Sequence, residues 1–184
     1  MKTENLYPYL LPGLVEPAWA DIAIPIGHGL FATLFEDQES DGGIVHVAVS
    51  PDQLQAANLS AADAHRIALE NLTRFADESP ALTIQVLGRA GDPVHFLLHS
   101  DHPRAAACLR LPDLFEQARE HLQTDELCAC VPQRESLVVL PKRDRAFREM
   151  LVGKLREIEA DSTHLLSFEL FELSPQVVRP FVES

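Results

Sequence analysis

Basic residues are scarce in this sequence: 15 lysines and arginines stand against 28 aspartates and glutamates, which gives a formal net charge of −13 at pH 7. A general nucleic-acid binder needs a basic face that displaces counterions from the phosphates, so the acid surplus argues against that class. The surplus suits a basic partner, such as a cationic protein attracted to an acidic surface. It equally suits a protein whose charge does no more than keep it in solution.

Long apolar runs are also absent. The uninterrupted runs cover only a few residues, whereas a helix that crosses a bilayer needs about 20. Residues 1–26 lack a basic segment followed by an apolar run, and prolines interrupt them, so we expect no secretory signal. The sequence therefore predicts a protein that does not associate with a membrane.

Cysteine is rare, and the three cysteines, Cys108, Cys128 and Cys130, are an odd number. In a strand, Cys128 and Cys130 would point to the same side about 7 Å apart, which is at the limit for an undistorted disulfide. A closed zinc site needs two more ligands, and no second Cys or His pair has a finger-like spacing. We therefore predict buried, reduced thiols in a cytoplasmic protein, with neither a metal nor a cofactor.

The signatures of common enzyme classes are missing, since no HExxH, GxSxG, P-loop or GxGxxG motif occurs. His95, His99 and His102 are close in the sequence, but an extended strand would hold His95 and His99 roughly 13 Å apart. We interpret these three as histidines of surface loops. Whether the protein is an enzyme stays open at this point.

Residues 127–147 are the stretch most informative about the fold. Residues 127–131 and 137–140 are apolar at nearly every position, which predicts strands covered on both faces of a sheet. The five residues between them predict a turn. Asp144 stands where the N-cap of a following helix would lie. The stretch therefore predicts a central hairpin followed by a helix.

The rest of the chain repeats this order of hairpin and helix. The predicted elements are hairpins of residues 30–36 with 44–49 and 82–87 with 94–98, helices over 61–75, 103–122 (in two pieces) and 145–160, and a strand over 165–171. This order predicts an α+β fold: a mixed or antiparallel sheet built from hairpins, with helices packed on its faces. The predicted organisation is an irregular N-terminal arm (residues 1–21), a single α+β domain (residues 22–173) and an extended C-terminal tail (residues 174–184).

Two features are candidates for a binding site. Asn71 falls in the middle of an apolar helix face, so its amide must either tie the helix to a neighbouring loop or contact a ligand. Residues 132–148 hold five bases against two acids within an otherwise acidic chain. A helix start with flanking bases can hold a phosphate or carboxylate, although the bases can also pair with the chain's own acids. The candidate ligand-binding residues are Asn71, Arg134, Lys142 and Arg143.

Three segments carry a further pattern: an apolar strand that ends in Asp37, the helical run Ala68-Leu69-Glu70-Asn71-Leu72, and the turn Pro132-Gln133-Arg134. In this combination, residues 22–173 resemble the bacterial YtpQ-like family of unknown function. The chain looks shorter at its N-terminus than typical members, and Glu135 stands where the family pattern has Asp. The resemblance implies a soluble bacterial protein in which Asn71 and Arg134 are the most distinctive polar positions.

These observations lead to two functional hypotheses. The first is a non-catalytic cytoplasmic binding protein, of an accessory or immunity type, that neutralises a basic protein partner. The second is an enzyme or sensor for a small anionic ligand bound at the basic turn and helix start (Arg134, Lys142 and Arg143). The acid surplus favours the first, and the local cluster of bases favours the second.

Overall fold

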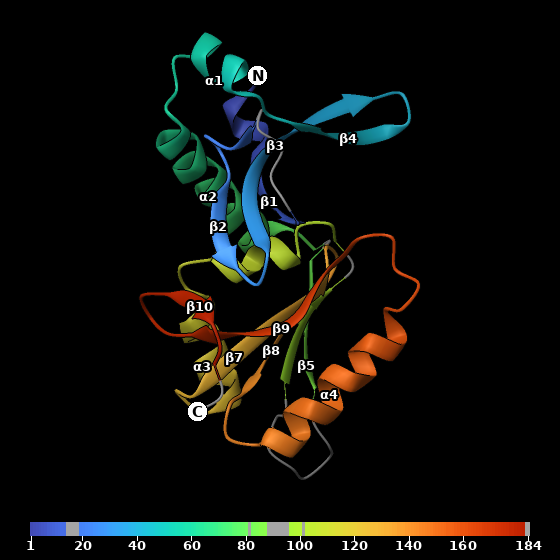
Figure 1. The fold of residues 1–184 in the computed structure, drawn as a ribbon. Coiled ribbons are helices and arrows are strands. Elements are labelled where there is room, and N and C mark those ends of the chain that lie inside the picture. Colours follow the sequence, from blue (N-terminus) through green and yellow to red (C-terminus); the bar gives the residue numbers. More distant parts are fainter. Residues whose placement is uncertain (14–18, 81, 88–95, 101, 183–184) are drawn as a thin grey trace.

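In the part of the chain that the structure describes, the strands form two antiparallel sheets, one of four strands and one of six, against which the helices pack (Figure 1). The computed structural model describes residues 1–13, 19–80, 82–87, 96–100 and 102–182. The predicted α+β class is confirmed, and the sheets are antiparallel. No helix among the described residues is long and apolar enough to cross a bilayer.

The four-stranded sheet is organised around its longest strand, β3. Its strands are β1 (Leu6–Pro12), β2 (Ile24–Gly27), β3 (Leu30–Ser40) and β4 (Gly43–Ala48). β1 pairs along one edge of β3, and β2 and β4 pair along the other. Residues 6–12 are thus a strand, where the sequence predicted an irregular arm. Pro8 and Pro12 suggested irregular structure, but β1 is an edge strand, and an edge strand tolerates proline where the N–H faces outward.

The six-stranded sheet has the order β10-β9-β7-β8-β6-β5. Its strands are β5 (Thr83–Leu87), β6 (Phe96–Ser100), β7 (Leu127–Gln133), β8 (Leu137–Pro141), β9 (Leu165–Leu173) and β10 (Val178–Pro180). β7 and β8 form the predicted hairpin in the middle of the sheet, and every residue of β8 is buried. The predicted tail contributes β10, which pairs with the end of β9. Residues 88–95, which include the turn of the second predicted hairpin and His95, lie outside the described part of the chain.

The helical elements are η1 (Thr3–Asn5), α1 (Pro51–Ala56), α2 (Ala61–Glu78), η3 (Ala106–Arg110), α3 (Leu114–Leu122) and α4 (Arg145–Ile158). The predicted N-caps are confirmed: Ser60 accepts a hydrogen bond from the Asp63 amide, and Asp144 accepts one from the Phe147 amide. Pro112 separates η3 from α3, so the two predicted pieces are also confirmed.

Both faces of the β7–β8 hairpin are covered, as its apolar pattern predicted. On one face, Cys128, Cys130, Val138 and Leu140 pack against Leu151 of α4. The other face belongs to the largest apolar cluster, which joins η3 and α3 to Leu10 of β1 and Leu30 of β3. One continuous core therefore contains residues of both sheets.

The sequence predicted the burial of the cysteines correctly but not that of His99. All three cysteines are free and buried, and burial raises the pKa of each thiol to about 12. His99, interpreted as a surface residue, is buried at 2% exposure in β6, and burial lowers its pKa to about 4. That interpretation was wrong because β6 lies inside the sheet, between β5 and β8, and is not a loop.

Gly27, at the end of β2, lies against Pro180 of β10 and so joins the two sheets. Its φ of +106° is one that only glycine adopts easily, and a Cβ at this position would overlap the Pro180 ring. We expect Gly27→Ala to lower the free energy of unfolding by about 2–4 kcal/mol, through backbone strain and overpacking together.

Gly29→Ala is the matched control, to be measured with Gly27→Ala by urea unfolding. Its φ is +70°, but no atom lies within 4 Å of the added Cβ, so only the backbone cost of about 1–2 kcal/mol applies. Equal losses in the two variants would show that the contact between β2 and β10 does not constrain the fold.

Candidate ligand-binding site

The four residues predicted to bind a ligand do not come together. Arg134 lies in the turn between β7 and β8, whereas Lys142 and Arg143 follow the other end of β8. Five extended residues separate these ends by roughly 17 Å. Asn71 is on α2, which contacts the four-stranded sheet. A single anion site made of these residues is therefore not supported.

Lys142 lies in an ion-paired cluster with the chain's own acids. Its Nζ is 2.5 Å from Glu172 Oε1, and the same carboxylate accepts from Arg179 Nε at 2.7 Å. The two cations hold the pKa of Glu172 below its ordinary value, with the Lys142 hydrogen bond as the larger effect. Arg145, in the first turn of α4, likewise pairs with Glu149. Much of the basic cluster is thus neutralised internally, and Arg143 is exposed.

Asn71 connects α2 to the start of the chain. Its Nδ2 donates to the carbonyl oxygens of Thr3, at 2.8 Å, and Leu6, at 2.9 Å. Its Oδ1 accepts from Arg74 Nη2 at 3.3 Å. The side chain is 5% exposed, so these internal bonds satisfy it. The structural interpretation of Asn71, as a tie between the helix and a neighbouring segment, fits these contacts, and ligand contact does not.

A buried polar network occupies the region where the four-stranded sheet meets the loop that precedes η3. His46 Nδ1 lies 2.7 Å from Asp37 Oδ1 and 2.9 Å from the Tyr9 hydroxyl. The other oxygen of Asp37 accepts from Arg104 Nη2. Burial raises the pKa of the Tyr9 hydroxyl, so Tyr9 remains a neutral phenol. We call Tyr9, Asp37, His46 and Arg104 the Asp37 network.

Aromatic rings enclose the cation of this network. The Arg104 guanidinium lies 3.4 Å from the Tyr7 ring centroid and 4.3 Å from that of Phe75, and the residue is 5% exposed. Arg134 joins from the β7–β8 turn, with its guanidinium 6.0 Å from the Tyr9 ring. Among the described residues no serine, threonine or cysteine side chain bonds to His46, so the network provides no nucleophile and base pair. The network is therefore a structural clamp: its contacts hold the four-stranded sheet against the loop before η3 and the β7–β8 turn.

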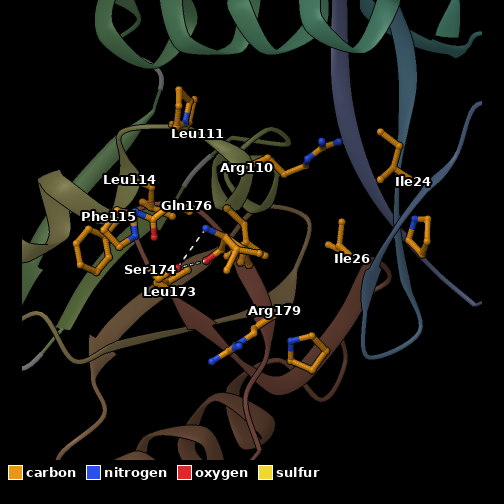
Figure 2. A pocket seen from close by; sticks show the side chains of 17 residues that line it. Ile24, Ile26, Arg110, Leu111, Leu114, Phe115, Leu173, Ser174, Gln176 and Arg179 are labelled. Carbon is orange, nitrogen blue, oxygen red and sulfur yellow. Dashed lines mark hydrogen bonds between the residues drawn. The ribbon is translucent and has the colours of Figure 1, made fainter. Parts of the chain in front are cut away.

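A pocket of about 400 Å³ opens between β2, the segment from η3 to α3, and the loop from β9 to β10 (Figure 2). This volume is within the range of small-molecule sites. The wall is mainly apolar and includes Ile24, Ile26, Leu111, Leu114, Phe115, Leu173 and Val178. The Ser174 hydroxyl donates to the Val177 carbonyl and accepts from the Val177 amide, so the loop that closes one side is internally bonded.

Arg110 is the distinctive charged residue of this pocket. Figure 2 shows its side chain extending from η3 toward Ile24 of β2. Burial lowers the pKa of its guanidinium, and no carboxylate of the described residues offsets that effect. Arg179 also lines the pocket, but it pairs with Glu172. Arg110 is therefore a partly buried cation whose charge the described part of the chain leaves uncompensated.

A second pocket, of about 460 Å³, lies between α4 and β9, and Arg148 and Arg156 are part of its lining. Its Arg156 pairs with Glu169 at 3.7 Å, and both residues are part of the lining. Glu149 in the same lining pairs with Arg145. Because Arg156 and Glu149 are ion-paired and Arg148 is buried, the pocket around Arg110 is the better candidate for an anion.

Sequence reasoning did not find Arg110. The available signal was one base, Arg110, between two leucines in an otherwise apolar segment that ends at Pro112. No group of three His, Cys, Asp or Glu side chains placed to hold a metal ion occurs among the described residues. Comparison with protein-family models, with curated proteins and with solved structures finds no match to this chain. The resemblance to the YtpQ-like family therefore stays a prediction.

Proposed function

We propose that the protein is a binding protein for a small anion with an apolar body, such as an alkyl or aryl carboxylate, held in the pocket around Arg110. The observation that carries the proposal is the uncompensated, partly buried charge of Arg110 in a pocket that is lined mostly by apolar residues. The ligand class is the one predicted from the basic residues, but the site is a different one.

The energetics favour an anion with an apolar part. A cation that is removed from water without a partner is costly, and a carboxylate that pairs with it recovers part of that cost. A hydrogen bond to a charged group contributes about 1.5–3 kcal/mol. Each methylene buried against the wall adds about 0.8 kcal/mol. A ligand with both parts uses the whole pocket, whereas an inorganic anion would use only Arg110.

A non-catalytic role and a cytoplasmic location remain part of the proposal. The described residues at the pocket include no nucleophile paired with a base, which supports binding without chemistry. Three buried, unpaired thiols are compatible with a reducing compartment.

Thermal unfolding in the presence of acetate, butyrate, hexanoate and octanoate tests the proposal. We expect the melting temperature to rise in a saturable way and to rise more with longer chains. At a hundred times its dissociation constant a ligand stabilises by about 2.7 kcal/mol, which is roughly 5–10 °C for a chain of this size. Hexanol, which keeps the apolar body but lacks the charge, is expected to have a much smaller effect.

Two arginine variants test whether the rise in melting temperature depends on Arg110. Arg110→Met is expected to abolish the rise caused by hexanoate, because the charge at the pocket is lost. Arg66→Met removes an arginine that is 60% exposed on α2 and is expected to leave the rise unchanged. The same rise in both variants, or with hexanol, would reject Arg110 as the anion-binding group.

A further inference from the structure

The hairpin of β3 and β4 extends beyond the rest of its sheet (Figure 1). We call this extension, residues 36–48, the arm; it is not the predicted N-terminal arm. The pairing of β1 with β3 ends at Glu36, whereas β3 and β4 stay paired as far as Ser40 and Gly43. Residues 38–45 are all exposed. The end of the arm is therefore two strands wide, and within the described residues no strand pairs with the outer edge of β4.

The edge of β4 lacks the features that usually protect such a strand. Edge strands in proteins commonly carry charged side chains, prolines or bulges, which hinder the addition of another strand. β4 reads GIVHVA and has none of these. Ile44 is 62% exposed and Val45 48% exposed. Because alternate residues of an edge strand turn their N–H and C=O groups outward, this edge can accept an extended segment of another protein.

The charge of the arm indicates which kind of segment it would accept. Residues 36–48 contain four acids and no lysine or arginine. Asp37 pairs with Arg104, and Glu36 accepts from the Lys2 amide. Glu39 and Asp41 are exposed, and neither forms an ion pair with another described residue. A second copy of the chain would bring the same net charge of −13, so electrostatic repulsion opposes pairing of the arm with itself.

We propose that the arm docks an extended segment of a basic protein, which adds as a strand to the outer edge of β4. Its lysine or arginine side chains would lie on the face of Glu39 and Asp41, and its apolar side chains on the opposite face, near Val45, because Glu39 is paired with Ile44 and successive residues alternate faces. The outer edge of β4 would thus be the docking surface for the basic protein partner that the acid surplus predicted. The proposal does not depend on the pocket around Arg110, to which the arm contributes no residue.

A labelled, end-capped octapeptide of alternating arginine and valine is a suitable probe, with binding measured by fluorescence anisotropy. We expect saturable binding that weakens steeply with salt. The same peptide, N-methylated at every second residue on its bonding edge, keeps the charge but cannot add to a strand. It is expected to bind at least about tenfold more weakly, because the strand bonds are lost.

Matched charge variants separate the arm from general attraction. Glu39→Gln combined with Asp41→Asn is expected to weaken binding about tenfold, since two ion pairs are lost. Asp77→Asn combined with Glu78→Gln changes the net charge equally on exposed residues of α2 and is expected to change the affinity by less than about twofold.

Three results would overturn the proposal. Equal weakening in the two double variants would mean that the peptide recognises only net charge. Equal affinity of the methylated peptide would exclude strand addition. A dimer in sedimentation equilibrium that Val45→Lys dissociates would assign the edge of β4 to a second copy.

Discussion

Replacing Arg104 by methionine is expected to lower the free energy of unfolding by about 3–5 kcal/mol, because the Asp37 carboxylate would be left buried without its cation. Asp37 is 7% exposed and Arg104 5% exposed. The substitution also removes the guanidinium between the Tyr7 and Phe75 rings, a contact worth up to about 2 kcal/mol where it is desolvated. Methionine keeps much of the side-chain volume, so the change acts mainly on the charge.

Two comparisons identify the cause of this loss. The double variant Asp37→Asn, Arg104→Met also removes the carboxylate charge that Arg104→Met leaves unpaired, so it is expected to be more stable than Arg104→Met alone. Arg119→Met breaks an ion pair with Glu116 in which both side chains are about half exposed, and it is expected to cost at most about 1 kcal/mol. If urea unfolding gave Arg104→Met the same small loss as Arg119→Met, the Asp37 network would not be a structural clamp.

Val139→Asp is expected to prevent folding. Val139 is 0% exposed in β8 and pairs with Ala129 of β7 on one side and Leu97 of β6 on the other. A carboxylate at this position has no cation among its strand neighbours, and an uncompensated buried charge costs more than the typical stability of a domain allows. The expected observation is loss of the cooperative unfolding transition.

Val182→Asp provides the same change of side chain at an exposed position, since Val182 is 81% exposed. We expect its melting temperature to stay close to that of the parent protein, because surface substitutions usually change stability by less than about 0.5 kcal/mol. A soluble Val139→Asp variant that melted like Val182→Asp would contradict the central position of β8.

The sequence predicted best those elements whose signals lie in neighbouring residues. The apolar runs before and after the turn at Arg134 defined the β7–β8 hairpin, and Ser60 and Asp144 marked the starts of α2 and α4. In each case the signal and the element occupy the same short segment. The type of each of these elements could therefore be predicted without knowledge of the tertiary packing.

Features that depend on long-range pairing were not predicted. β1 is a strand because β3 supplies its hydrogen-bond partners, and its prolines obscured that role. Asp37 and Arg104 are 67 residues apart, and no local pattern connects them. The pocket around Arg110 is built from three segments spread over the whole chain. The basic residues that stood out in the sequence instead lie at opposite ends of β8.

Calorimetric titration of hexanoate into the protein and into its Arg110→Met variant is the most direct test of the proposed ligand site. We expect one site per chain, with a negative heat-capacity change because apolar surface is buried. The dissociation constant should rise about 10- to 150-fold in Arg110→Met, which corresponds to the loss of a charged hydrogen bond of about 1.5–3 kcal/mol. Absence of saturable heat with the parent protein, or equal affinity for both proteins, would contradict a site for small anions around Arg110.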